Sequence, residues 1–165
     1  MSDDWFSSEK AEGYDCAIVC ENGHPINEHS GTRPAFNARF CKGCGAIGIV
    51  QCVDCRAPVR GNELGHWGGY TPPAHCHECG TAFVWTARKT AALQAYIDEF
   101  EDFDGPMREL LSRSIPDIIA ATPMSDVAGL RWKTVIRGLK ENVRAGVVKL
   151  LTSVACDEFK EQVGL

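Results

Sequence analysis

The fold of this chain is decided by residues 41–55, CKGCGAIGIVQCVDC, where two pairs of cysteines follow one another closely. A further pair, Cys20 with His24, precedes this stretch, and another, Cys76 with Cys79, comes after it. A structural zinc ion takes four nitrogen or sulfur ligands in a tetrahedron, and two ligands a few residues apart can both face one ion. The four pairs therefore supply the donors of two complete zinc sites.

The distances along the chain between these pairs are those of zinc ribbons. Sixteen residues separate the first pair from the second, and twenty separate the third from the fourth. We predict that sequential pairs share an ion, because the apolar run 45–51 is long enough for one strand leading from one ribbon into the next. Interleaved and nested pairings satisfy the spacing as well. The predicted metal ligands are Cys20, His24, Cys41, Cys44, Cys52, Cys55, Cys76 and Cys79.

Other donors lie close to these ligands in the chain. Cys16 comes four residues before Cys20 and could take the place of His24. The turn at Asn22-Gly23 favours the histidine, because it folds the chain back toward the cysteine. Iron in place of zinc is also compatible with a cysteine-rich site. The alternative donors of the second site are His75 and His77, whereas His29 and His66 have the pattern of ordinary loop histidines.

A disulfide framework is the other use of so many cysteines. The nine cysteines are an odd number, and residues 1–10 are acidic and polar with no apolar signal segment. Disulfides persist in oxidising compartments, whereas free thiols in the cytosol usually indicate metal binding. We therefore expect a cytoplasmic protein whose cysteines are reduced and hold two zinc ions.

The residues around the predicted ligands resemble a known family. The matching motifs are Cys20-x-Asn22-Gly23-His24-x-x-Asn27, Phe40-Cys41-x-x-Cys44-Gly45-Ala46, Cys52-x-x-Cys55-x-x-Pro58-x-Arg60-Gly61, Tyr70-x-x-Pro73, Cys76-x-x-Cys79-Gly80 and Trp85-Thr86. They resemble an uncharacterised bacterial double zinc-ribbon family, a domain of unknown function, and the helical remainder is similar to its C-terminal half. The resemblance implies two ribbons on a helical tail and no established activity. The chain departs from the family pattern at Val53 and Val84, neither of which is a predicted ligand.

Length and composition predict an α+β protein in two parts. The 165 residues are 44% hydrophobic, which suffices for a modest core, and no run approaches the roughly 18 apolar residues of a membrane span. We expect a loose tail over 1–15 anchored by Trp5 and Phe6, a double zinc-ribbon domain over 16–86 and an α-helical domain over 87–165. The ribbon domain alone would bury too little apolar surface, so zinc binding should supply its folding energy.

Helical periodicity begins after Trp85. The apolar residues that recur at helical spacing are Leu93, Tyr96, Ile97 and Phe100, and they predict a helix over 87–103. Asp104-Gly105-Pro106 starts a short helix to about residue 113, Ser114-x-x-Asp117 resembles a capping box, and Thr122-Pro123 predicts another N-terminus. Two helices should follow, giving a bundle of four or five. The apolar residues of the last one are Val143, Val147, Leu150, Leu151, Val154 and Phe159.

The net charge of −5 is unevenly distributed. Residues 98–104 carry five acids and no base, whereas residues 131–149 carry six bases against Glu141 alone. On a continuous helix, four of these bases would form one stripe beside an apolar face. The stripe is either a track for phosphate or an acidic partner, or a solvated helix face. Its residues are Lys133, Arg137, Lys140 and Arg144.

We favour a non-enzymatic zinc-ribbon adaptor whose ribbons present a docking surface to a protein partner. A catalytic zinc keeps an open position for water, whereas two shells of four ligands are closed. The chain also lacks the His-x-Glu before Pro-Cys-x-x-Cys that zinc deaminases use. A zinc-dependent hydrolase or deaminase is therefore the third hypothesis, and it requires His24 not to be a ligand.

The second hypothesis is a nucleic-acid-binding regulator. Residues 1–88 carry seven Lys or Arg against ten Asp or Glu, which disfavours duplex binding but leaves single strands on a small basic and aromatic patch. The many apolar residues of a small bundle leave a homodimer open. The contact residues of these hypotheses are Arg56, Arg60, Trp67, Tyr70 and the four stripe residues.

Overall fold

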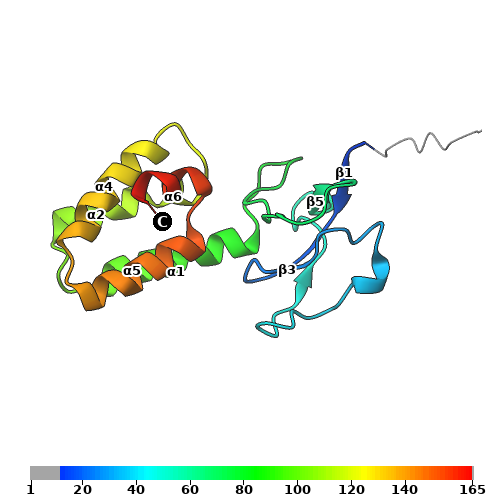
Figure 1. Ribbon diagram of the computed structural model, residues 1–165, viewed down its shortest axis with the longest axis horizontal. Helices are drawn as coiled ribbons and strands as arrows, with labels where there is room; N and C mark the ends of the chain where they lie inside the picture. The colour runs from blue at the N-terminus through cyan, green and yellow to red at the C-terminus, as the bar shows by residue number, and fades with distance from the viewer. Residues whose placement is uncertain (1–11, 165) are drawn as a thin grey trace, which may run out of the picture. The chain divides into compact units, whose positions relative to one another are not determined.

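The computed structural model describes residues 12–164, apart from the side chains of Asn142 and Glu158. The chain divides into two compact units, one up to Trp85 and the other from Thr86 onward. Figure 1 shows short strands and long loops in the first and helices in the second. We call them the ribbon unit and the helical unit. The predicted α+β class is confirmed.

The ribbon unit contains two small antiparallel sheets. One pairs β1 with β5, and the other has the strand order β3-β2-β4. The pairing of β4 with β2 shows that the apolar run after Cys44 does supply a strand. A 3-10 helix, η1, spans Pro34–Phe36. The strands are β1 (Tyr14–Cys16), β2 (Ile18–Cys20), β3 (Pro25–Asn27), β4 (Gly48–Ile49) and β5 (Arg60–Glu63).

Strand β1 corrects the expected boundary of the N-terminal tail. Tyr14 and Asp15, predicted to be part of a loose segment, belong to β1, and Asp15 is only 8% exposed. Tyr14 pairs with Glu63 of β5, so this part of the chain is held by a ladder. The proposed anchors Trp5 and Phe6 lie outside the described residues.

The core of the ribbon unit is small, and two of its members are predicted metal ligands. Phe83 and Trp85 stack with ring centroids 4.4 Å apart, and Trp85 Nε1 donates to the Pro73 carbonyl at 2.9 Å. This apolar cluster is too small to stabilise a unit of this length by burial alone. Its buried residues are Ala17, Val19, Cys52, Val59, Cys76, Phe83 and Trp85.

The helical unit contains six helices among the described residues, rather than four or five. The predicted break at residues 104–106 is present, and the Asp104 carboxylate accepts a hydrogen bond from the Met107 N–H at 2.8 Å at the start of α2. The helices are α1 (Val84–Glu99), α2 (Gly105–Arg113), α3 (Ile115–Ile119), α4 (Ser125–Gly138), α5 (Glu141–Val154) and α6 (Asp157–Val163).

Two predicted helix signals act differently in the structure. Ser114 does not cap α3; its hydroxyl donates to the Leu111 carbonyl at 2.6 Å and accepts from Trp132 Nε1 at 2.9 Å. The predicted last helix ends at Val154, so Phe159 lies on a separate helix, α6. The reason is tertiary, because the Cys156 N–H donates to the Ile118 carbonyl at 2.7 Å rather than continuing the helical ladder.

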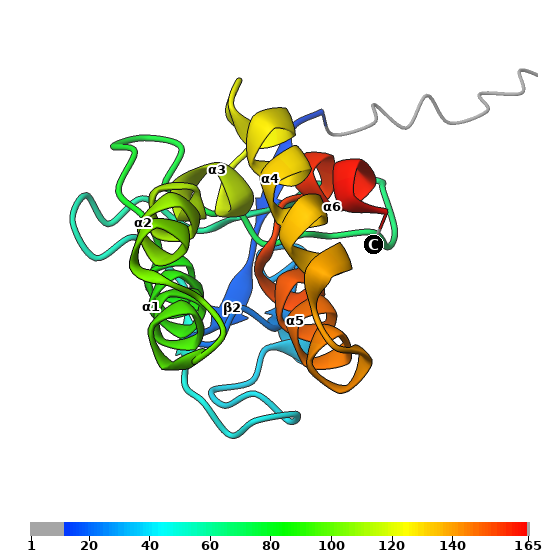
Figure 2. The same cartoon turned by 90° about the vertical axis from the view of Figure 1, so that its left-hand side faces the viewer.

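The helices enclose one extended apolar core. In Figure 2, α4 lies beside α5 and α6, and it packs against both of them and against α3. Trp132, at the centre of α4, is fully buried. The buried core residues are Leu93, Ile97, Phe103, Leu111, Ile115, Ile118, Ile119, Ala128, Trp132, Val147, Leu151, Val154, Ala155 and Phe159.

Candidate metal centres

Four donors gather at the first cluster, which consists of Cys20, His24, Cys41 and Cys44. Their ligand atoms all lie within 4.8 Å of one another. The Cys20 sulfur is 3.6 Å from His24 Nδ1 and 3.7 Å from the Cys44 sulfur, and Cys41 Sγ is 3.8 Å from His24 Nδ1. Cys16 is not a member of the cluster.

The second cluster consists of Cys52, Cys55, Cys76 and Cys79, whose sulfur atoms also lie within 4.8 Å of one another. The Cys52 and Cys79 sulfurs are 3.6 Å apart, and those of Cys55 and Cys76 are 3.5 Å apart. Neither histidine beside Cys76 belongs to the cluster. The sequential pairing is therefore the one that the fold adopts.

The dimensions of both clusters fit a tetrahedral ion. Zinc–sulfur bonds of about 2.3 Å and zinc–nitrogen bonds of about 2.0 Å place neighbouring donors about 3.5–3.8 Å apart. The measured separations of 3.5–3.8 Å match these edges. Two such donor sets fit zinc ribbons, and among the described residues no other group of three or more potential metal ligands gathers in this way.

Three cysteine pairs share one backbone turn. The N–H of Cys41 donates to the carbonyl five residues later at 2.9 Å, and the Gly45 N–H donates back to Cys41 at 2.8 Å. The same two bonds recur after Cys52 and after Cys76. Isolated bridges flank the three turns, joining Phe40 to Ile47, Gln51 to Pro58 and His75 to Ala82.

This turn requires positive φ directly after the second cysteine. Gly45 and Gly80 meet the requirement with φ of 71° and 75°. Arg56 occupies the same position after Cys55 with φ of 62°, the one non-glycine positive φ among residues 12–164. A side chain in this left-handed region costs about 1 kcal/mol or more, so the turn at 52–55 is strained.

The first pair uses the predicted Asn22-Gly23 turn. The Cys20 N–H donates to the His24 carbonyl at 2.9 Å, and the His24 N–H points at the Cys20 sulfur from 3.3 Å. Gly23 has φ of 85°, and a Cβ there would lie 3.2 Å from Trp85 Cβ. The turn therefore needs glycine both for its backbone conformation and for its approach to the core.

The ligands alternate between the protein side and the solvent side. In every pair the first ligand is buried and the second is exposed. The first cluster therefore presents His24 and Cys44 to solvent, whereas the second presents Cys55 and Cys79. The two clusters differ in the number of sulfur atoms that solvent can reach.

The outer contacts of the exposed sulfurs also differ. The Asn22 side-chain amide donates to the Cys44 sulfur at 3.4 Å. Beside Cys79, the Thr81 hydroxyl lies 3.4 Å from the sulfur but donates to the Asp54 carboxylate at 2.6 Å. The second cluster thus has an acidic side chain in its immediate surroundings.

The thiol pKa values diverge in the absence of metal. The Ala46 N–H, followed by the Asn22 amide, lowers the pKa of Cys44 to about 6, and the Thr81 hydroxyl and N–H lower that of Cys79 to about 6. The Ala57 N–H lowers the pKa of Cys55, but loss of solvation and the neighbouring sulfurs outweigh it and raise the value to about 12. A metal ion replaces such shared protons, because it binds thiolates.

Two of the four predicted contact residues of the ribbon unit, Arg60 and Trp67, lie in arginine–aromatic contacts. The Arg33 guanidinium lies 3.7 Å from the centre of the Trp67 ring, and Arg60 lies 4.7 Å from that of Tyr14. Tyr70 donates its hydroxyl hydrogen to the Arg60 carbonyl at 2.6 Å. Arg56 is exposed beside the second cluster.

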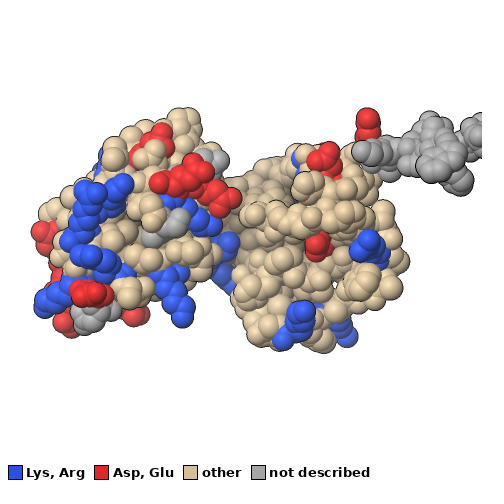
Figure 3. All heavy atoms as spheres, viewed as in Figure 1, with Lys and Arg blue, Asp and Glu red and all other residues tan. Residues whose placement is uncertain are grey.

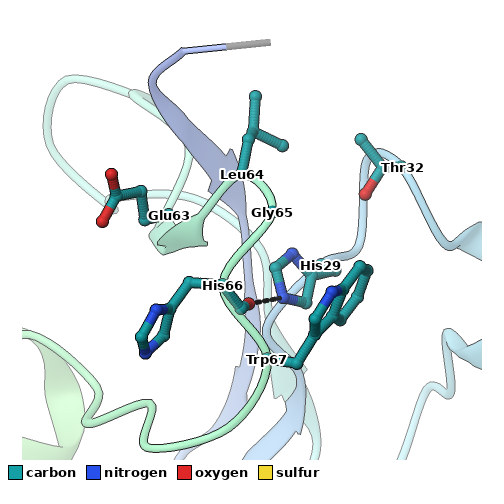
Figure 4. Close-up of a pocket in the computed structure, with 7 residues that line it drawn as sticks. All are labelled: His29, Thr32, Glu63, Leu64, Gly65, His66 and Trp67. Atoms are coloured by element: carbon teal, nitrogen blue, oxygen red, sulfur yellow. Dashed lines mark hydrogen bonds between the residues drawn. The ribbon is translucent and has the colours of Figure 1, made fainter. Parts of the chain in front are cut away.

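His29 is a buried residue and not an ordinary loop histidine, which corrects the expectation from the sequence. It is 3% exposed, its Nε2 donates to the His66 carbonyl at 3.0 Å, and its ring lies 4.7 Å from that of Trp67. Figure 4 shows this arrangement at a pocket of about 440 Å³. His29 Nδ1 faces the Asp15 carboxylate at 3.6 Å.

Asp15 holds the loop that carries His29. Its carboxylate accepts from the N–H groups of Cys16, Gly31 and Thr32 at 2.6, 3.0 and 3.1 Å, and from the Thr32 hydroxyl at 2.5 Å. Burial raises the pKa of Asp15, but these hydrogen bonds, led by the Thr32 hydroxyl, outweigh it and lower the value. The sequence contains no local motif that joins Asp15 to His29.

The predicted basic stripe does not form on one helix. Helix α4 ends at Gly138, Lys140 lies between the helices, and Arg144 lies on α5. The Arg144 guanidinium turns back to cap α4, donating to the Ile136 carbonyl at 3.1 Å and to those of Arg137 and Leu139 at 3.1 and 3.3 Å.

The other two residues of the stripe lie on α4, where Arg137 is exposed and Lys133 has a structural contact. It donates to the Gln162 carbonyl at 3.1 Å, near the end of α6. On the face shown in Figure 3, the basic atoms of the helical unit form several groups interspersed with acidic ones. Two of the four predicted contact residues of this unit therefore serve its own packing.

An apolar groove runs beside the second cluster within the ribbon unit. Its volume is about 590 Å³, and its lining includes Cys52 and the buried Phe83. Val53, at the tip of the cysteine turn, is 85% exposed, and Val50 is 52% exposed. The apolar lining also includes Ile49, Ala82 and Val84, and the charged residues of the lining are Arg56 and Glu21.

These features define a class of protein in which two four-donor clusters that fit zinc ribbons are followed by a helical unit. Residues 13–163 match the family described as "Uncharacterized protein conserved in bacteria (DUF2321)", and the chain belongs to this family. No curated protein and no solved structure was found to match the chain. None of the helices in the described part of the chain combines the length and apolar character that spanning a bilayer requires.

Proposed function

We propose that this protein is a zinc-binding, non-enzymatic adaptor whose ribbon unit docks a partner protein. The observation that carries the proposal is the apolar groove beside the second cluster. Its lining includes the exposed Val50 and Val53, although the ribbon unit has a small apolar core. Exposed apolar surface of this kind is typical of interaction sites. The clusters would act as rigid supports that hold the groove open.

Zinc is the proposed ion in both clusters. Thiolate and imidazole donors in a tetrahedral arrangement suit zinc, and a closed shell of four such donors leaves no position for water or substrate. A bound ion here would be structural and would supply folding energy. These considerations support a non-enzymatic role and disfavour a hydrolase or deaminase.

The proposed occupant of the groove is an extended segment of a partner protein with apolar side chains and a neighbouring carboxylate. The apolar side chains would pack on Phe83 and against Val50 and Val53. The carboxylate would meet Arg56, which is exposed, whereas Glu21 is half-buried and already has an interaction of its own. Charge at the rim thus favours an acidic partner.

A peptide-display selection tests this function directly. Random decapeptides are selected against the zinc-loaded protein, and the binders are measured by calorimetry. We expect apolar sequences with an adjoining Asp or Glu, whose affinity falls at least about tenfold for Val53→Asp and for Arg56→Glu. The matched control is Leu130→Asp on α4, which is also exposed and should leave binding unchanged.

Two results would contradict the groove as the docking site. Selected peptides that bind Val53→Asp and the original protein equally would show that another surface is used. A selection that yields no binder at micromolar concentration would remove the groove as a peptide site. Zinc content is measured for each variant, so a loss of binding through unfolding is recognised.

A single-strand nucleic-acid binder is the alternative function, supported by the arginine–aromatic contacts at Trp67 and Tyr14. Aromatic rings and arginines together bind unpaired bases and phosphates. Binding of a labelled oligonucleotide should then weaken steeply with salt and be lost in Arg60→Glu. The capping roles of Lys133 and Arg144 leave fewer free bases for such a surface.

Two further expectations accompany the adaptor function. Cysteines that bind metal instead of forming disulfides are typical of the reducing cytoplasm, so we propose a cytoplasmic location. The chain also leaves homodimerisation open, and light scattering across a range of protein concentrations measures it.

A further inference from the structure

We propose that the second cluster is a site of oxidation, at which a hydroperoxide joins Cys55 and Cys79 in a disulfide and releases the ion, while the first cluster keeps its own. The inference rests on zinc occupying both clusters, as in the proposed function. It assigns the clusters different chemistry, although three of their four ligand pairs share the same turn.

The first observation is the solvent side of each cluster. In the second cluster both exposed donors are sulfurs, those of Cys55 and Cys79. In the first, one exposed donor is His24, which a hydroperoxide does not convert into a disulfide partner. An oxidant arriving from solvent therefore meets two accessible sulfurs at the second cluster and only Cys44 at the first.

The chemistry balances with one molecule of hydrogen peroxide, the simplest hydroperoxide. One exposed thiolate attacks a peroxide oxygen, which breaks the O–O bond and gives a sulfenic acid and, after protonation, water. The second thiolate attacks the sulfenic sulfur, forms the S–S bond and expels a second water after protonation. Two electrons pass from the sulfurs to the peroxide. Cys55 and Cys79 would then no longer hold an ion, and Cys52 and Cys76 would take up protons on its release.

The electrostatic surroundings favour the second cluster as the reactive one. Four thiolates around a doubly charged ion leave one more negative charge than three thiolates and a neutral imidazole, and greater thiolate character increases reactivity. A hydrogen-bond donor reaches an exposed sulfur in both clusters, the Asn22 amide at Cys44 and the Thr81 N–H at Cys79, so the clusters differ here in net charge.

Backbone strain acts in the same direction. Arg56 holds positive φ directly after Cys55, where the corresponding residues of the other two turns are glycines. Opening the turn at 52–55 relieves this strain, whereas opening the turn at Gly45 relieves none. The ligand pair that must move to form a disulfide thus includes a member of the strained turn.

Time-resolved native mass spectrometry of the two-zinc protein tests the inference. The protein is treated with excess hydrogen peroxide, and remaining thiols are alkylated and mapped. We expect the ion of the second cluster to leave at least about tenfold faster than the ion of the first cluster. Its loss should be accompanied by one disulfide between Cys55 and Cys79. Cys20, Cys41 and Cys44 should still be alkylatable after denaturation at that point.

A reciprocal pair of ligand swaps sharpens the test. Cys79→His gives the second cluster the donor set of the first, and its ion should then leave at least about tenfold more slowly. His24→Cys gives the first cluster a second exposed sulfur, and its ion should leave faster. Each variant is used only after native mass spectrometry shows two zinc ions, and either one suffices if the other fails to load.

Several results would overturn the inference. Equal rates of loss from the two clusters, earlier loss from the first, or loss of zinc without a disulfide in the second would each contradict it. An unchanged rate in the loaded His24→Cys variant would do the same. Purified protein with iron or with no metal would instead contradict the proposed zinc function, so the two failures are distinguishable.

Discussion

The ribbon unit and the helical unit solve the problem of stability in opposite ways. Among the described residues, the ribbon core has seven buried members, two of which are cysteines of the second cluster. The helical core has fourteen, and all are apolar residues that pack without any metal ligand. The comparison predicts that metal binding would replace apolar burial in the ribbon unit, whereas the core of the helical unit contains no predicted ligand.

Removal of metal should destabilise the ribbon unit and leave the stability of the helical unit unchanged. This is the largest effect that we expect. A chelator should unfold the ribbon unit, which loses on the order of ten kcal/mol per site, and leave the helices folded. Hydrogen exchange followed by mass spectrometry should rise over residues 14–85 and stay low over 93–159. Added zinc should restore the first segment, and equal loss of protection in both would contradict the comparison.

Truncating the centre of the helical core should have the next largest effect. Trp132 is fully buried and bonds Ser114, so Trp132→Ala should lower the free energy of unfolding of the helical unit by about 3–5 kcal/mol. Urea denaturation followed by circular dichroism measures it. Leu130→Ala, on the same helix but 60% exposed, is the control and should cost less than about 1 kcal/mol.

A methyl group at Gly61 should destabilise the ribbon unit by about 3 kcal/mol, because overpacking against backbone has no cheap relief. A Cβ there would lie 2.4 Å from the Glu28 carbonyl oxygen and 2.7 and 2.8 Å from those of Cys16 and Asp15. The chelator concentration that releases zinc should fall in Gly61→Ala. Gly43→Ala, whose Cβ would be 3.8 Å from the Cys41 sulfur, should behave like the original protein.

Removal of the Arg144 cap should weaken only the helical unit. Arg144→Ala leaves three carbonyls at the C-terminal end of α4, those of Ile136, Arg137 and the C-cap Leu139, without their charged donor, at a cost of about 2 kcal/mol. Arg137→Ala, an exposed residue of the same predicted stripe, should change stability by less than about 0.5 kcal/mol. If the two variants unfolded at the same urea concentration, the capping role would be refuted.

Relief of strain at Arg56 should give the smallest change, a gain. Arg56→Gly should stabilise the zinc-loaded ribbon unit by about 1 kcal/mol, because glycine adopts positive φ freely. The reciprocal Gly45→Arg should cost a similar amount. Thermal unfolding of the loaded proteins measures both, and a destabilised Arg56→Gly would mean that the side chain has a compensating contact.

Local chemistry made much of the ribbon unit predictable. The eight donors stand in four pairs, each on a tight turn, so the sequence itself shows which residues are donors, whereas the fold selects the sequential pairing. The change to helices near Trp85 and the break at residues 104–106 are equally local, because they depend on periodicity and on Asp104 as an N-cap.

Long-range contacts decided the features that sequence reasoning missed. The last predicted helix is divided because the Cys156 N–H bonds Ile118, and the basic stripe is divided because Arg144 caps the preceding helix. The pairing of His29 with Asp15 joins residues that no motif links. Cys156 and Ile118 are distant in sequence, as are His29 and Asp15, whereas Arg144 reaches back from α5 to the end of the preceding helix. Periodicity within one element carries no information about any of these contacts.

The measurement that tests this account most directly is the metal content of the purified protein, determined by native mass spectrometry with elemental analysis. Two zinc ions per chain are predicted, both lost with the ribbon fold when a strong chelator is added and both regained with it. A folded ribbon unit with no metal would contradict the account, because its apolar core would then have to suffice by itself.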